Sequence, residues 1–77
     1  MRKLSKKQKN IIKDYAKSGY FENSGLINKY GNKDILISQL EKVNIYENME
    51  GDLDRLIGDL LFTNTLDEKI RLIDNFS

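Results

Sequence analysis

The chain contains no cysteine, histidine, proline or tryptophan. Without cysteine, disulfides and cysteine-based zinc sites are impossible. The commonest general base and the commonest soft nucleophile of enzymes are therefore both missing. The serines lie in no G-x-S-x-G or S-x-x-K pattern, and no glycine-rich phosphate loop follows a strand-like segment. We predict a protein that is not an enzyme and has no catalytic residue, cofactor or small-molecule substrate.

Long hydrophobic runs are also missing. No window approaches the eighteen or so apolar residues that a membrane-spanning helix needs, and no apolar segment follows the basic N-terminus as in a secretory signal. We therefore expect a cytoplasmic protein. Lysine, asparagine and isoleucine are abundant and arginine is rare, which is typical of an AT-rich bacterium or of its phages and plasmids.

The 77 residues suffice for one small domain spanning residues 1–77, and 39% of them are hydrophobic. The apolar residues recur at helical spacing, whereas strand-like alternation is weak. We predict an all-α fold, a small compact bundle of four to five short helices. Because so small a core is only marginally stable, both a monomer and a homodimer are compatible with the sequence.

Capping residues and glycines give the expected helix limits. Ser5 and Thr65 are N-cap candidates, Thr65 with Glu68 in a capping box, and Gly19 is a candidate helix stop. The predicted helices cover about residues 5–18, 24–31, 33–43, 47–62 and 65–76. Ile35 is expected to widen the apolar stripe of the third helix, and Leu66, Ile70 and Ile73 are expected to point inward from the last helix. The residues predicted to be buried together are Ile12, Leu40, Leu56, Ile57, Leu60 and Ile70.

Basic residues are concentrated in the first helix. Residues 1–17 carry seven basic side chains against one acidic, whereas residues 18–77 carry six against eleven. At about 100° per residue, the basic side chains of this helix fall within an arc of roughly 80°, opposite its apolar stripe. They are Arg2, Lys6, Lys9, Lys13 and Lys17. A solvated face, a phosphate-binding surface and a membrane-surface role all remain open.

Residues 26–40 resemble a helix-turn-helix, the motif that places its second helix in the major groove of DNA. Gly31 occupies the turn, and Ile37 and Leu40 fit core positions of the second helix. Ile27 and Asn32 depart from the pattern, and an ordinary helix pair joined by a glycine remains an alternative. The resemblance implies that Lys33 and Lys42 contact nucleic acid together with the lysines of the first helix.

The segment 47–59 is rich in acidic residues. Its oxygen-bearing side chains match the spacing of a calcium loop, but Leu53 stands where that loop requires glycine, so we predict a helix and no metal site. Two glycines at helical spacing leave a shallow groove on one face of this helix. Either packing within the chain or a partner fills it, and the candidate partner-binding residues are Glu50, Gly51, Asp54 and Gly58.

Taken together, these patterns predict a non-catalytic macromolecule-binding module. Nucleic acid is slightly favoured as its partner, in an accessory or regulatory role, through Lys6, Lys9, Lys13, Lys17, Lys33 and Lys42. The alternative is a protein-interaction module, such as a small phage-type inhibitor or adaptor of a host protein.

Overall fold

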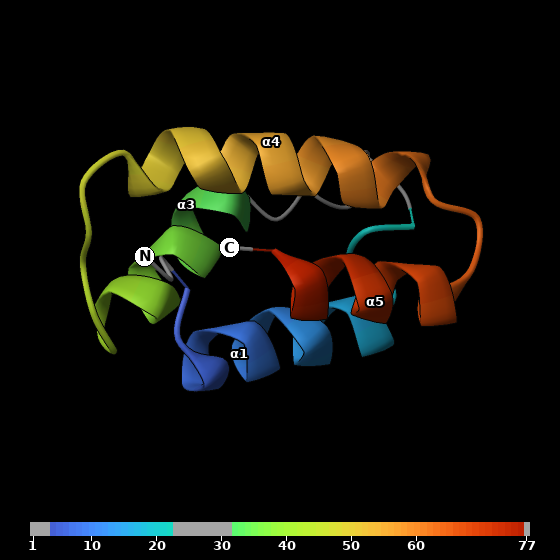
Figure 1. Ribbon diagram of the computed structural model, residues 1–77, viewed down its shortest axis with the longest axis horizontal. Coiled ribbons are helices and arrows are strands. Elements are labelled where there is room, and N and C mark those ends of the chain that lie inside the picture. The colour runs from blue at the N-terminus through green and yellow to red at the C-terminus, as the bar shows by residue number, and fades with distance from the viewer. Residues whose placement is uncertain (1–3, 23–31, 77) are drawn as a thin grey trace.

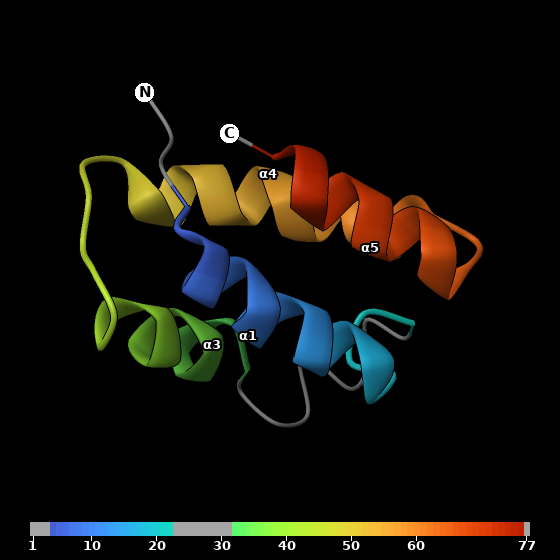
Figure 2. The ribbon, with the colours of Figure 1, turned by 60° about the horizontal axis from the view of Figure 1, so that its bottom comes forward.

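The computed structural model describes residues 4–22 and 32–76, and within these residues it is built of helices without a β-strand. The helices are α1 (Lys6–Lys17), α3 (Asn32–Glu41), α4 (Met49–Phe62) and α5 (Leu66–Asn75). Helix α4 runs along one edge of the molecule, and the other helices lie on one side of it (Figure 1). Helix α1 packs against both α3 and α5, which flank it (Figure 2). The predicted small all-α bundle is confirmed.

Helix α1 begins with a reciprocal pair of hydrogen bonds. Ser5 Oγ accepts from the backbone N of Gln8 (3.1 Å), and Gln8 Oε1 accepts from the backbone N of Ser5 (2.9 Å). This capping box satisfies backbone donors that the first turn leaves without partners. The helix ends at Lys17, and Gly19 has a φ of 85°, which glycine adopts without strain. The predicted cap and glycine stop are confirmed.

The other described helices start or end within two residues of the prediction. Helix α3 ends at Glu41, and α4 begins at Met49 after Asn48, whose φ of 62° is left-handed. At the start of α5, Thr65 Oγ1 accepts a hydrogen bond from the backbone N of Glu68 (3.2 Å), as the capping pattern predicts. The predicted helix at residues 24–31, which is the first half of the helix-turn-helix pattern, lies outside the described residues.

Residues from every described helix meet in one apolar core. Five of the six residues predicted to be buried together, all except Ile70, belong to it. Helix α5 contributes Ile73, which is buried as expected. The buried hydrophobic residues are Leu4, Ile12, Ala16, Phe21, Leu36, Leu40, Met49, Leu53, Leu56, Ile57, Leu60 and Ile73.

Three apolar residues lie further out than predicted. Ile35 is 51% exposed, because it lies about 100° around α3 from the buried Leu36. Leu66 is exposed at the first position of α5, beside the turn from α4. Ile70 is only partly buried, because the inward face of α5 is centred on Lys69 and Ile73.

Candidate binding surfaces

The lysines of α1 divide between the interior and the surface. Lys9 is 9% exposed, and its Nζ donates a hydrogen bond to the backbone oxygen of Asp74 at the end of α5 (3.0 Å). Lys13 forms an ion pair with the carboxylate of the same Asp74. Both side chains point toward α5 because α1 packs along that helix. Lys9 is therefore buried against α5, and Lys13 is partly buried beside it.

The other predicted phosphate-binding residues that the structure describes are more exposed. Lys6 and Lys17 are exposed on α1, eleven positions apart and so about 16 Å apart along the helix. Lys42 is exposed after the end of α3. Arg2 and the side chain of Lys33 lie outside what the structure describes. Within the described residues, the structure thus brings Lys9 and Lys13 together at Asp74 and leaves Lys6 and Lys17 on the outside.

Gln8, which the sequence reasoning missed, is fully buried between α1 and α3. Its Nε2 donates to the backbone oxygens of Leu40 (2.9 Å) and Asn44 (2.8 Å), while its Oε1 takes part in the capping box of α1. One side-chain amide therefore hydrogen-bonds to backbone groups both at the start of α1 and at the end of α3. The local half of this role was readable from the S-x-x-Q pattern at residues 5–8, and the contact with α3 was not.

Lys69, also missed, performs the equivalent task at the end of α4. It is 2% exposed, and its Nζ donates to the backbone oxygens of Leu60 (3.1 Å) and Thr63 (2.7 Å) and to Thr63 Oγ1 (2.9 Å). An ammonium group has three donors, and all three are used here. A cation is also favoured at the negative end of the helix dipole. The last turns of α3, α4 and α5 contain no basic residue, so side chains from elsewhere in the sequence close these helix ends.

The acidic segment folds as the predicted helix. Asp52 is buried within α4 and lies 3.5 Å from both Asn48 Nδ2 and Arg55 Nη2. Among the residues that the structure describes, no group of three acidic side chains is arranged to hold a metal ion.

The other described helices lie on one side of α4 (Figures 1 and 2), and the predicted partner-binding residues fall at exposed or partly buried positions of this helix. Glu50, Gly51 and Asp54 are exposed and Gly58 is partly buried. Arg55 and Phe62, which we did not predict, continue the same face at helical spacing. We call this surface the outer face of α4, made of Glu50, Gly51, Asp54, Arg55, Gly58 and Phe62.

The two glycines of the outer face differ in their surroundings. A Cβ at Gly51 would lie 2.7 Å from Asn48 Oδ1, so this glycine makes room for the side chain that precedes the helix. A Cβ at Gly58 would meet nothing within 4 Å. Packing within the described part of the chain therefore explains Gly51 and does not explain Gly58.

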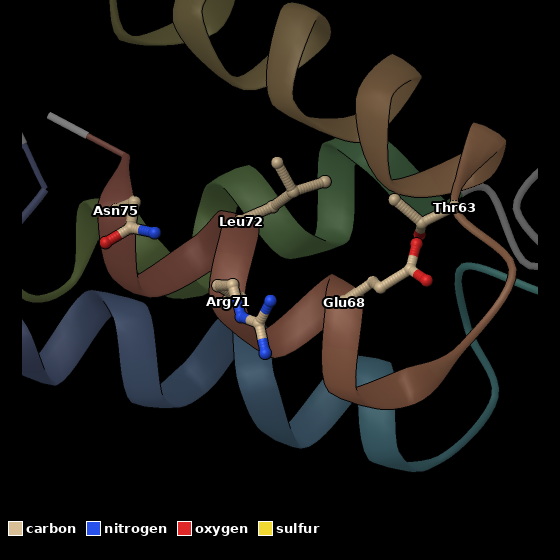
Figure 3. A pocket seen from close by; sticks show the side chains of 5 residues that line it. All are labelled: Thr63, Glu68, Arg71, Leu72 and Asn75. Atoms are coloured by element: carbon tan, nitrogen blue, oxygen red, sulfur yellow. The ribbon is translucent and has the colours of Figure 1, made fainter.

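A hollow opens beside the turn that joins α4 to α5. It has a volume of about 250 Å³ and is lined by Thr63, Glu68, Arg71, Leu72 and Asn75. Figure 3 shows Leu72 extending from α5 on the side of α4, while Arg71 leaves the helix in another direction. Sequence reasoning missed this hollow, because it depends on how two helices meet. We call it the α5 hollow.

None of the helices in the described parts of the chain has the length and apolar character needed to cross a membrane. Comparison with protein-family models, with curated proteins and with solved structures finds no match for this chain.

Proposed function

We propose that this chain is a non-catalytic protein-binding domain that recognises its partner through the outer face of α4, with Phe62 as the main anchor. The observation that carries the proposal is the exposure of Phe62, which is 89% accessible at the end of that face. Burying a phenylalanine side chain contributes about 1.5–3 kcal/mol, which is a large share of the free energy of a moderate complex. Aromatic residues are also well represented among the anchors of protein interfaces.

The rest of the outer face suits the approach of a second protein. Gly58 presents backbone without a side chain, so a partner helix can come close there. Glu50 and Asp54 on one side and Arg55 on the other supply charges for orientation around the anchor. A compact helical domain with one such face fits the role of a small inhibitor or adaptor, acting in the cytoplasm of an AT-rich bacterium or encoded by its phage or plasmid.

Nucleic-acid binding, which the sequence favours slightly, becomes the second candidate. The exposed Lys6, Lys17 and Lys42 support it. Three phosphate contacts from these lysines would make log K fall with log salt concentration with a slope of only about 2.7 in magnitude, whereas proteins that make six to ten contacts show clearly larger slopes. The carboxylate of Asp74, beside Lys13, would also repel a phosphate backbone.

Affinity capture combined with duplex binding tests this proposal. The tagged domain, Phe62→Ser and Ile45→Ser are each incubated with lysate of a low-GC bacterium, and bound proteins are identified by mass spectrometry. Ile45 is also a well-exposed apolar residue, but it lies in the connection between α3 and α4 and so serves as the matched control. We expect a protein that the wild type and Ile45→Ser retain and that Phe62→Ser loses.

Equal capture by Phe62→Ser would contradict the proposal. Anisotropy of a short labelled duplex at about 50 mM salt is the competing measurement, because phosphate contacts are strong there. The second candidate would be favoured by tight duplex binding in which log K falls with log salt concentration with a slope well above two in magnitude. Changing Lys6 and Lys17 to glutamine should then weaken this binding.

A further inference from the structure

The α5 hollow and Phe62 are linked through the chain. Phe62 directly precedes Thr63, the residue that lines the hollow on the side of α4. The hollow is larger than the cavity of about 150 Å³ that binds benzene in a well-studied protein core, so it has room for one phenyl ring. A protruding ring and a hollow able to receive such a ring are therefore close together on one chain.

We propose that a second copy of this chain binds here, with Phe62 of each copy seated in the α5 hollow of the other. Contacts related by a two-fold axis are isologous, so each copy must present both halves of the contact on one patch. Phe62 and the lining residue Thr63 are consecutive, so the two halves of the proposed contact belong to the same end of α4. A chain with the protruding ring and the hollow on opposite sides would instead form an open-ended array.

The charges around the hollow are self-complementary. Glu68 and Arg71 both line it and are three residues apart on α5, so they lie on neighbouring positions of the helix surface. When two copies of α5 run antiparallel across a two-fold axis, Glu68 of each copy faces Arg71 of the other. The same two residues thus form two opposite-charge pairs in a dimer of identical chains.

This inference rests on the proposed function, in which Phe62 is a protein contact, and it adds a second copy of the chain as a partner at that contact. Sedimentation velocity over a concentration series tests it with the full chain. We expect the mass of the wild type to rise from that of one chain toward that of two. Phe62→Ser should weaken association at least tenfold, whereas Ile45→Ser should leave it unchanged.

Two charge reversals make the test specific for this geometry. Glu68→Arg places four positive charges around the contact and Arg71→Glu places four negative ones, so each variant alone should stay monomeric. Mixed in equal amounts, the two variants should form a heterodimer, because each positive side chain then faces a negative one. The substituted residues Ile45, Phe62, Glu68 and Arg71 are all exposed, so the variants should fold. Far-UV circular dichroism of each variant verifies this.

A wild type that stays monomeric at every concentration would overturn the inference. So would a dimer that either charge reversal leaves intact, or a mixture that fails to associate while the wild type does. The proposed function fails separately: Glu68→Arg retains Phe62, so a foreign protein bound through Phe62 should still be captured by this variant.

Discussion

At the scale of single residues, long polar side chains close helix ends that their own helices leave open. Lys69 inserts a fully used ammonium group at the end of α4, and Gln8 bridges the start of α1 and the end of α3. The exposed carbonyls of a last turn require partners, and a buried end without them is destabilising. Both residues are buried, and both are polar because their end groups donate hydrogen bonds to backbone oxygens at the helix ends.

The contribution of Lys69 can be measured directly. Lys69→Met keeps the apolar stem but removes three hydrogen bonds from a charged donor, so we expect a loss of about 2 kcal/mol in the free energy of unfolding. Urea denaturation measures this loss. Lys42→Met, at an exposed position, is the control and should change stability by less than about 0.5 kcal/mol. Equal stability of the two variants would mean that the hydrogen bonds of Lys69 add nothing to the fold.

Two tyrosines give the domain a specific sensitivity to alkali. Burial, with a smaller effect of the neighbouring Tyr15, raises the pKa of Tyr20 to about 12. Burial, followed by the charge of Asp52, also raises the pKa of Tyr46 above its ordinary value. The ring of Tyr20 lies edge-on to both Tyr15 and Phe21, with centroids 4.9 Å apart in each pair, which places it in a packed aromatic group.

The sign of the resulting pH dependence follows from the unfolded chain, in which tyrosine ionises near pH 10. The stabilisation by neutral Tyr20 is complete below pH 10 and is lost as the pH rises toward 12, with a limiting slope of about 1.4 kcal/mol per pH unit. Tyrosinate absorbance should show Tyr20 and Tyr46 ionising later than an ordinary tyrosine, and Tyr20→Phe should remove the contribution of Tyr20 to this late ionisation. A titration in which every tyrosine ionises near pH 10 would contradict this assignment.

At the scale of helices, the sequence predicts what is local and misses what is not. Ser5 with Gln8, and Thr65 with Glu68, are each three residues apart, so periodicity and capping patterns suffice to find them. The hydrogen bonds from Gln8 to Leu40 and from Lys9 to Asp74 span 32 and 65 residues. No local pattern records which helix end a side chain will meet. Ile70 was misplaced for the same reason, since Lys69 occupies the inward face.

The two glycines of α4 allow a matched test of local structure. Gly58→Ala should raise the free energy of unfolding by roughly 0.5–1 kcal/mol, because alanine favours the helix and its Cβ meets no neighbour. Gly51→Ala should gain less or lose stability, because its Cβ would push the amide of Asn48 away from Asp52. Thermal unfolding of both variants gives the comparison. An equal gain at the two positions would show that Asn48 moves without cost.

The position of Gly58 also bears on the outer face of α4. The helical spacing of Gly51, Asp54 and Gly58 was sufficient to propose a partner face, and in the structure these residues are exposed or partly buried. Phe62 was missed because it follows Leu60 and Leu61 and looks like part of the same apolar stripe. Its position about 180° from Leu53 turns it outward.

At the scale of the whole molecule, α1, the first helix, packs against α5, the last helix. It packs between α3 and α5, and Asp74 near the C-terminus receives both Lys9 and Lys13. A helical projection correctly groups the lysines in one arc but contains no information about α5, which covers part of that arc. Two of the four α1 lysines assigned to phosphate binding thus contact Asp74 of α5 in this structure. The same geometry moves the proposed interaction surface from α1 to α4.

Unfolding of Lys9→Gln and Lys17→Gln in urea tests this reassignment most directly. The two lysines lie on the same helix and undergo the same change, but only Lys9 is buried against α5. We predict that Lys9→Gln lowers the free energy of unfolding by about 1–2 kcal/mol, because glutamine is too short to reach Asp74. Lys17→Gln should stay within about 0.5 kcal/mol of the wild type. Two variants as stable as the wild type would contradict the account, since Lys9 would then belong to a solvated basic face.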